Sequence, residues 1–276
     1  MPAKRDTTSP GDPLQVFRAL WLHRDVVWEM SRREVLGRYR GSVLGVLWSF
    51  CNPLLMLAIY TVVFGVIFPA RWETPGGRGE FALVLFAGLI VYTLFAECVG
   101  RAPALVVGRP SYVRKVVFPL EVLPWVVMGS ALFHAGIGLA VLLLVQSALY
   151  GPPGWSVLAL PLLLLPCVLF TMAISWLLAA LGVFFRDTAQ AVGFFTLAVL
   201  FLSPVFYPVA ALPEPLRDWV WLNPLAFVIE EVRGVIFADA IPRWGALAMT
   251  SALGLIAAWL GLAWFEKTRP GFADVL

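Results

Sequence analysis

Two arginines flank a tyrosine immediately before the first long apolar segment of the chain. The stretch, from Arg38 to Leu55, reads RYRGSVLGVLWSFCNPLL. A guanidinium group donates paired hydrogen bonds to phosphate oxygens, so Arg38 and Arg40 at the edge of a membrane segment are suited to bind lipid phosphates. The same residues also fit a simpler role as positive anchors at the membrane surface. The sequence leaves both interpretations open.

Asn52 and Pro53 interrupt the apolar run that follows. Proline removes a backbone hydrogen bond and crowds the carbonyl of Ser49, four residues earlier, so we expect a bend in this helix. The amide of Asn52 can pair with a freed backbone group or with a neighbouring helix. Bends of this kind are common in membrane helices and indicate no function by themselves.

Motifs for catalysis or metal binding are missing from the sequence. It has neither a G-x-x-x-x-G-K-[ST] phosphate loop nor a G-x-S-x-G serine motif. His23 and His134 stand at no metal-ligand spacing, and Cys51, Cys98 and Cys167 lie in or beside apolar runs. We therefore expect no catalytic, metal or cofactor site, and we interpret His134 as a polar group satisfied between helices.

The composition is that of an integral membrane protein. Of the 276 residues, 61% are hydrophobic and only 13% are charged, whereas a soluble domain has roughly 45–50% apolar and about 25% charged residues. Several uncharged stretches reach the ~20 helical residues that cross a bilayer. The period-2 alternation of a membrane barrel is absent. The sequence predicts an all-α polytopic membrane protein.

Six transmembrane helices are expected, and turns rich in Gly and Pro, such as YGPPGW, separate some of them. They cover roughly Val43–Phe68, Phe81–Gly100, Phe118–Leu149, Trp155–Phe184, Thr188–Tyr207 and Trp244–Phe265.

The basic residues predict the orientation. With the N-terminus inside, fifteen of the twenty lysines and arginines fall on inner segments and five on outer ones, so both termini are expected in the cytoplasm. The N-terminus has no apolar stretch with a cleavage site, so no signal peptide is expected. The expected parts are a cytoplasmic segment (1–42), a membrane domain (43–266) and a cytoplasmic tail (267–276).

The N-terminal segment predicts an amphipathic helix that lies in the headgroup plane, although a soluble, partner-binding helix is also possible. Glu29 can pair with Arg32 or Arg33 on its polar face. The predicted apolar face consists of Leu14, Trp21, Trp28 and Val35, with Phe17, Leu20 and Val27 beside them.

The loop 101–117 separates the second and third spans. Gly108 and Pro110 break the chain, and the following SYVRKVVF predicts a short helix with Ser111 as its cap. Arg114 and Lys115 would point into the cytoplasm. A loop that only connects two spans would need neither the aromatic ring of Tyr112 nor a helix cap, so we expect that a partner docks here.

Charged residues are scarce inside the predicted spans. Glu97 and Arg101 form an i,i+4 pair near the inner end of the second span. Ion-coupled carriers usually place charged groups at mid-membrane. An external energy source therefore fits better than a proton or sodium gradient.

Five segments carry a resemblance to a known family. In order along the chain they read RYRGSVLGVLWSFCNPLL, SYVRKVVFPLEVLP, FFRDTAQ, LSPVFYP and WLNPLAFVIEEVRG. Together with the span count and the length, they resemble the membrane permease subunit of ABC-2 type polysaccharide exporters, in the O-antigen and teichoic-acid group. The resemblance to the capsule-export branch is looser.

The resemblance implies a homodimer in the cytoplasmic (inner) membrane, joined by two separate ATP-binding subunits that carry ATP and Mg. It implies export of a lipid-diphosphate-linked glycan, as in lipopolysaccharide biosynthesis, and membrane lipids but no nucleic acid as further partners. The lipid-phosphate entrance would be Arg38, Tyr39 and Arg40. The residues that couple to the ATPase would be Arg109, Ser111, Tyr112, Arg114 and Lys115.

The segment 208–243 is long, yet its apolar parts are too short to span. Pro215 and Pro224 suit the first turns of two short helices, and Asn223 suits a cap. Leu225, Val228, Val232 and Val235 follow helical spacing opposite Glu230 and Arg233. The resemblance implies a re-entrant pair that gates the outer exit, whereas the residues also fit an ordinary amphipathic loop. The expected gate residues are Trp219, Trp221, Asn223, Pro224, Glu230 and Arg233.

Aromatic residues are abundant, at 14% of the chain. Sugar C–H faces pack against aromatic rings, so a glycan channel should be lined by them, although many rings must face lipid instead. The candidate channel residues are Trp48, Tyr60, Phe64, Phe194, Phe195, Phe201, Phe206 and Tyr207.

Other functions remain open at this point. Within transport, the substrate of an ABC-2 exporter could instead be a capsule polysaccharide, a teichoic acid, a drug or a simple lipid. A membrane glycosyltransferase or phosphatase would need clustered acids or histidines at a membrane face. The outer acids lack an Asp-x-Asp pair or a nearby histidine; they are Glu214, Asp218, Glu230, Glu231 and Asp239.

Overall fold

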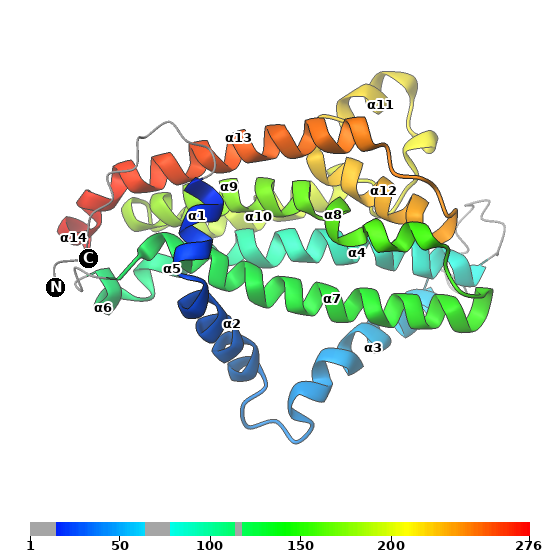
Figure 1. Cartoon of the computed structure of the whole chain (residues 1–276), viewed down its shortest axis with the longest axis horizontal. Helices are drawn as coiled ribbons and strands as arrows, with labels where there is room; N and C mark the ends of the chain where they lie inside the picture. Colours follow the sequence, from blue (N-terminus) through cyan, green and yellow to red (C-terminus); the bar gives the residue numbers. More distant parts are fainter. Residues whose placement is uncertain (1–14, 64–77, 114–117) are drawn as a thin grey trace.

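The chain folds into a bundle of long helices (Figure 1). The computed structural model describes residues 15–63, 78–113 and 118–276, and within these ranges it contains helices and no strand. The α-helices are α1 (Gln15–Leu22), α2 (Arg24–Arg38), α3 (Trp48–Val62), α4 (Arg78–Arg101), α5 (Ala104–Val107), α6 (Pro110–Val113), α7 (Leu123–Tyr150), α8 (Leu160–Leu163), α9 (Leu165–Phe184), α10 (Thr188–Leu202), α11 (Glu214–Val220), α12 (Pro224–Phe237), α13 (Trp244–Thr268) and α14 (Phe272–Val275).

Among the described residues, five stretches are long and apolar enough to cross a membrane, which confirms the all-helical membrane fold. They are Gly45–Val62, Glu80–Arg101, Leu120–Tyr150, Trp155–Phe184 and Trp244–Val275. They correspond to the first four predicted spans and the sixth. The part of the first predicted span from 64 to 68 lies outside the described residues.

The fifth predicted span forms the shorter helix α10. This helix has 15 residues, which at 1.5 Å per residue gives about 22 Å against a hydrocarbon core of roughly 30 Å. It ends at Leu202 because Ser203, which precedes Pro204, takes an extended conformation (φ −92°, ψ 147°). The remaining predicted residues, up to Tyr207, therefore form a turn.

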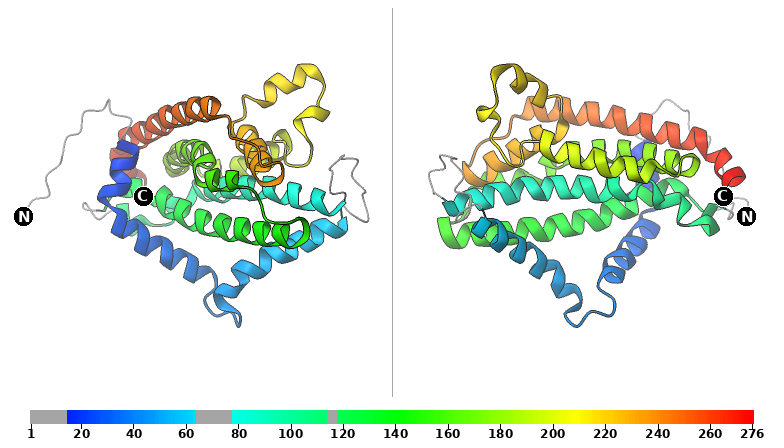
Figure 2. Two further views of the ribbon diagram at one scale, coloured as in Figure 1. Left: turned by 45° about the vertical axis from the view of Figure 1, so that its right-hand side comes forward. Right: turned by 180° about the vertical axis from the view of Figure 1, so that it is seen from behind.

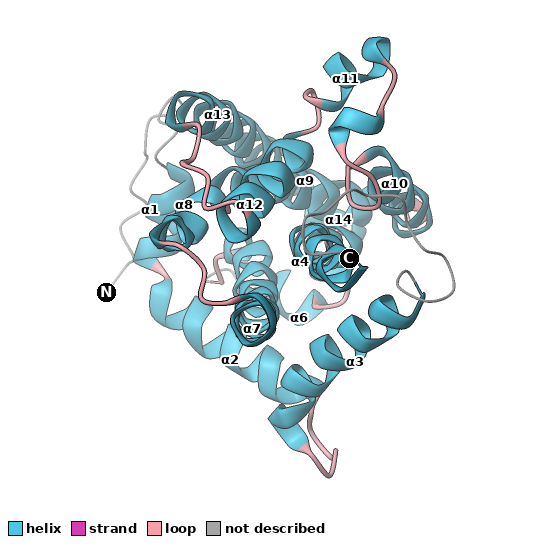
Figure 3. Ribbon diagram, turned by 90° about the vertical axis from the view of Figure 1, so that its right-hand side faces the viewer, coloured by secondary structure: helices cyan, strands magenta, loops and turns pink. Residues whose placement is uncertain are grey.

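Helix α4 is the centre of the bundle. In Figure 3 it lies among α3, α7, α9, α10 and α12. Its sequence is apolar on every side, as expected for a helix surrounded by other helices, and 72% of its apolar stretch is buried. Only 11% of the corresponding stretch that contains α3 is buried, so α3 lies at the periphery.

Helices α9 and α13 pack closely along their length. A Cβ atom on Gly261 of α13 would stand 2.4 Å from the carbonyl oxygen of Ala173 on α9. Only glycine permits this approach of the two backbones. The indole of Trp176 on the same face of α9 is fully buried and donates to the carbonyl oxygen of Glu121 at 3.0 Å.

The short elements gather at the two ends of the bundle. Helices α1, α5, α6 and α14 lie at one end, whereas α11 and α12 lie toward the other (Figure 1). Helices α2 and α3 form the two arms of a V whose connection projects from the side of the bundle (Figure 2).

The predicted single apolar face of the N-terminal segment is wrong. The chain forms two helices, α1 and α2, separated at His23. Trp21 and Trp28 are exposed, at 72% and 73%, whereas Val27 and Val35 are buried. The face of α2 that packs on α7 thus excludes Trp28 and includes the small polar residue Ser31.

Candidate functional site

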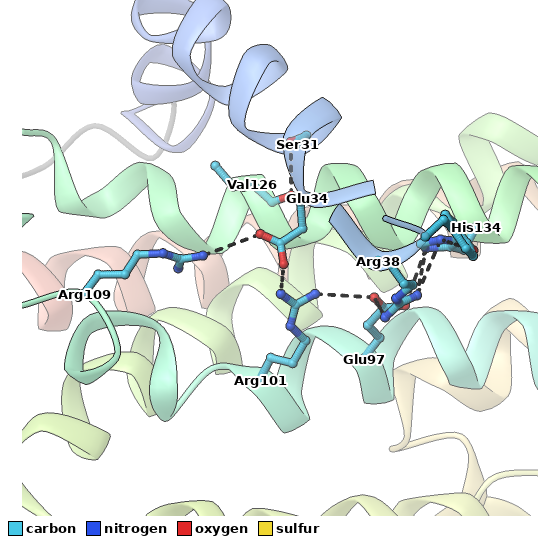
Figure 4. A network of polar contacts seen from close by, with 9 residues as sticks. Ser31, Glu34, Arg38, Glu97, Arg101, Arg109, Val126 and His134 are labelled. Carbon is cyan, nitrogen blue, oxygen red and sulfur yellow. Dashed lines mark hydrogen bonds and ion pairs between the residues drawn. The ribbon is translucent and has the colours of Figure 1, made fainter. Parts of the chain in front are cut away.

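A chain of charged side chains connects α2, α4 and the residue that precedes α6 (Figure 4). Glu34 of α2 contacts the guanidinium groups of Arg101 and, at 3.5 Å, Arg109. Glu97 of α4 lies 3.5 Å from Arg101, as expected for the i,i+4 pair, and 2.6 Å from Arg38. Each carboxylate is therefore shared between two arginines.

Glu34 is a site residue that sequence reasoning missed. Its partners Arg101 and Arg109 lie 67 and 75 residues further along the chain, so no local spacing indicates the contact. The one signal in the sequence was that Arg101 and Arg109 were both expected on the cytoplasmic side, where an acidic residue of the N-terminal segment could pair with them.

His134 of α7 ends this network. Its Nδ1 atom lies 3.2 Å from Arg38, and its Nε2 atom lies 3.0 Å from the Tyr39 hydroxyl. The interpretation of His134 as a polar group satisfied between helices is confirmed. Burial raises the pKa of the Tyr39 phenol despite the opposing charge of Arg38, so the hydroxyl keeps its proton at physiological pH.

Ser31 sets the distance between α2 and α7. Its hydroxyl donates to the carbonyl oxygen of Val126 at 3.0 Å. A Cβ atom on Gly129 would stand 2.5 Å from that hydroxyl oxygen, so the glycine makes room for the serine. The contact positions Glu34 and Arg38, which follow one and two turns later on α2.

The three predicted entrance residues occupy different environments. Arg38 and Tyr39 line a cavity of about 390 Å³ between α3, α4 and α7, together with Asn52 and Pro53. Arg40 is exposed on the surface. The two residues that interrupt the first span thus face the same space as Arg38. Phosphate binding by Arg38, Tyr39 and Arg40 stays a prediction.

The predicted coupling residues are placed in part. Arg109 joins the charged network, and the ring of Tyr112 stacks on Phe118 at 4.4 Å. The prediction that Ser111 caps a helix is wrong, because α6 begins one residue earlier, at Pro110. Proline favours the first helical position, where its missing N–H costs nothing. Arg114 and Lys115 lie outside the described residues.

The start of α12 confirms two predictions for the outer segment. Asn223 caps the helix by accepting a hydrogen bond from the Leu225 N–H at 3.0 Å, and Pro224 is its first residue. The Asn223 amide also donates to the hydroxyl of Ser203 at 2.8 Å. Asn223 therefore connects α12 to the end of α10.

Arg233 was predicted to lie opposite the apolar residues of its helix, and the structure buries it as well as them. Arg233 is 7% exposed and donates to the carbonyl oxygens of Val84, Pro204 and Val205 at 3.0, 2.6 and 2.7 Å. The turn after α10 presents carbonyls that no helix satisfies, and the buried guanidinium pairs with them. Glu230 completes the site at 3.4 Å.

A second ion pair lies near the same end of the bundle, between α12 and the residue before α13. Glu231 is 7% exposed and contacts Arg243 at 2.5 Å. The Arg243 guanidinium also lies 5.1 Å from the ring centre of Trp221, a cation–π distance. Trp221 thus packs on the residue that leads into α13. The side chain of Trp219 lies outside the described part of the structure.

The predicted channel aromatics remain a prediction. Phe194, Phe195 and Phe201 are exposed on α10, where they can contact lipid, a second subunit or a channel. Half-buried positions are taken by Trp48, Tyr60, Phe206 and Tyr207, whereas Phe64 lies outside the described residues.

Comparisons with known proteins agree with this architecture. Residues 25–237 match the family of ABC-2 type transporters. The chain is 30% identical to the O-antigen export system permease protein RfbA of Myxococcus xanthus, over 95% of this chain and 99% of the relative. It is 27% identical to RfbA of Klebsiella pneumoniae, over 91% and 95%, and 24% identical to the capsule polysaccharide export inner-membrane protein CtrC of Neisseria meningitidis, over 92% and 95%.

The family match covers most of the chain and includes nearly all of α2, the charged network and helices α11 and α12. The chain therefore belongs to the ABC-2 type transporter family and is a multi-pass membrane protein. The resemblance found in the sequence is confirmed at this level.

Proposed function

We propose that this chain is the permease subunit of an ATP-driven exporter of a lipid-diphosphate-linked polysaccharide. The observation that carries the proposal is the near-complete alignment with permeases named for O-antigen and capsule polysaccharide export. The higher identity to the O-antigen permeases favours an O-antigen-like glycan.

Separate subunits supply the energy. The chain has no phosphate loop of its own, so ATP and Mg bind to two partner ATPases, and two copies of this chain form the membrane part. The loop 101–117 is the docking site. In support, Arg109 and Tyr112 of this loop contact Glu34 and Phe118, so a movement of the loop reaches α2 and the segment that leads into α7.

Both chain termini lie in the cytoplasm, and the membrane is the inner one. The end of the bundle with α1, α5, α6 and α14 carries Arg101, Arg109 and Arg269, as the positive-inside rule requires of a cytoplasmic end. The opposite end, with the segment 208–243, is then the outer gate.

Deletion of this chain in its host provides the test. We expect the mutant to lose surface polysaccharide and to accumulate the lipid-linked polymer at the inner membrane, and the wild-type chain to restore export. Tagged protein purified in mild detergent should retain an ATPase with a phosphate loop in stoichiometric amount. A partner variant without the phosphate-loop lysine is the control and should block export with both proteins present.

Two results would contradict the proposal: normal surface polysaccharide in the deletion strain, or a chain that retains no ATPase under several gentle conditions. The similarity to CtrC makes capsule polysaccharide the second candidate. Chemical analysis of the lost polymer separates the two, because an O-antigen is found on lipopolysaccharide and a capsule polymer is not.

A further inference from the structure

Two cavities share Arg38 as a common wall. The deeper one, of about 390 Å³, lies between α3, α4 and α7. The other, of about 560 Å³, lies between α2, the end of α4 and the segment 109–112. Both volumes fall within the roughly 300–1,000 Å³ of small-molecule sites. The shared arginine joins them at the predicted inner edge of the membrane.

The cavity between α2, the end of α4 and the segment 109–112 is cationic. Arg33, Arg38, Arg101 and Arg109 line it. Arg33 pairs with Glu29, and the carboxylates of Glu34 and Glu97 balance only two of the other three positive charges. Three guanidinium groups also carry about fifteen N–H donors, whereas two carboxylates and one imidazole face them here. The cavity therefore has both net charge and hydrogen-bond donors left for an anion.

The deeper cavity changes from polar to apolar along its length. The polar residues Arg38, Tyr39, Glu97 and His134 lie at one end, where Glu97 pairs with Arg38, and Met56, Phe86 and Ile90 line the other. Its wall on α3 belongs to the least buried of the long helices. Such a space suits a hydrocarbon chain that enters from the lipid while its polar end stays beside Arg38.

We propose that this pair of cavities binds one anionic lipid, with its phosphate against Arg38, Arg101 and Arg109 and its hydrocarbon chain between α3, α4 and α7. The geometry carries the proposal: a cationic chamber and an apolar chamber meet at one arginine. The lipid's identity as the transported carrier rests on the proposed function. A phospholipid of the surrounding membrane carries the same chemistry.

Lipid binding to the full chain in phosphatidylcholine nanodiscs tests the site. The probes are a polyprenyl diphosphate, phosphatidylglycerol and inorganic diphosphate. Arg38→Gln and Arg101→Gln should each weaken binding of all three by roughly tenfold or more, since each removes a charge-assisted hydrogen bond. Arg32→Gln is the matched control, because Arg32 lies on the same helix, is exposed and lines neither cavity.

A second variant tests the apolar half without touching the ion pairs. Met56 is 47% exposed, so Met56→Trp can be accommodated while it fills the deeper cavity. It should weaken binding of both lipids several-fold and leave inorganic diphosphate unchanged. Retained diphosphate binding also shows that this variant is folded.

The outcomes separate the site from its occupant. Tighter binding of the polyprenyl diphosphate than of phosphatidylglycerol would identify the transported lipid as the ligand. Equal binding would identify a resident phospholipid and leave the export function standing. Unchanged lipid binding in Arg101→Gln or in Met56→Trp would overturn the site, whatever the deletion experiment shows.

Discussion

The guanidinium of Arg38 on α2 lies 2.6 Å from the carboxylate of Glu97 on α4. The side chain of Glu97 is only 16% exposed. This pair joins the helix that precedes the first span to the central helix of the bundle. Glu97 also holds Arg101, and Arg101 holds Glu34 back on α2. The two helices are thus connected by an alternating series of charges.

Loss of the shared carboxylate should destabilise this connection. In Glu97→Gln, Arg38 and Arg101 lose their common anion in a half-buried site, and we expect the free energy of unfolding to fall by about 1–3 kcal/mol. The thermal unfolding midpoint in detergent measures the effect.

The control is Glu29→Gln. Glu29 pairs with Arg33 at 2.8 Å, but both side chains are exposed, so the loss should stay below about 0.5 kcal/mol. Equal midpoints for the two variants would mean that the Glu97 network does not stabilise the fold.

Gly129→Ala should displace α2 from α7. The new Cβ atom would stand 2.5 Å from the Ser31 hydroxyl and 3.1 Å from its Cβ. Overpacking of this kind costs about 1–3 kcal/mol. Faster hydrogen exchange or trypsin cleavage in α2 would report the displacement.

Two further variants make this prediction specific. Gly136 lies on the same helix with nothing within 4 Å of an added Cβ, so Gly136→Ala should be neutral or stabilising by up to about 1 kcal/mol. Adding Ser31→Ala to Gly129→Ala should restore part of the protection of α2, because it removes the closest contact. A double variant no better than the single one would argue against this contact.

Arg233→Met should disrupt the packing between α12, α4 and the turn after α10. It removes the donor for three carbonyls at the end of α10 and on α4, and buried groups left unpaired cost about 1–3 kcal/mol each. We expect a fall in the thermal midpoint well beyond that of Arg217→Met. Arg217 donates to the carbonyls of Ala210 and Leu212, and Ala210 is exposed, so water can replace the lost donor. Similar midpoints would contradict the assigned role of Arg233.

Glu34→Gln should uncouple transport from ATP hydrolysis. Glu34 connects α2 to Arg109 of the proposed docking loop, so its loss should lower the amount of glycan exported per ATP hydrolysed several-fold while the partner's ATPase activity persists. Reconstituted vesicles that contain both subunits measure the two rates together. Glu29→Gln serves as the control, and a proportional loss of both rates would indicate a folding defect instead.

Local patterns of the sequence were sufficient to predict the helices and several of their ends. Residues without charge over about 20 positions must form hydrogen-bonded helices in lipid. Asn223 and Pro224 begin α12 as predicted, because capping and proline at the first position depend only on neighbouring backbone groups. Pro204 stops α10 for the same kind of local reason.

The tertiary structure decided which polar residues meet. Ser31 packs on Gly129, Glu34 contacts Arg101 and Arg109, and Arg233 is buried against the turn after α10. None of these contacts follows from spacing, since the partners are distant in the sequence. In an apolar bundle each polar group must find a partner somewhere, and the folded arrangement of the helices determines which partner lies within reach.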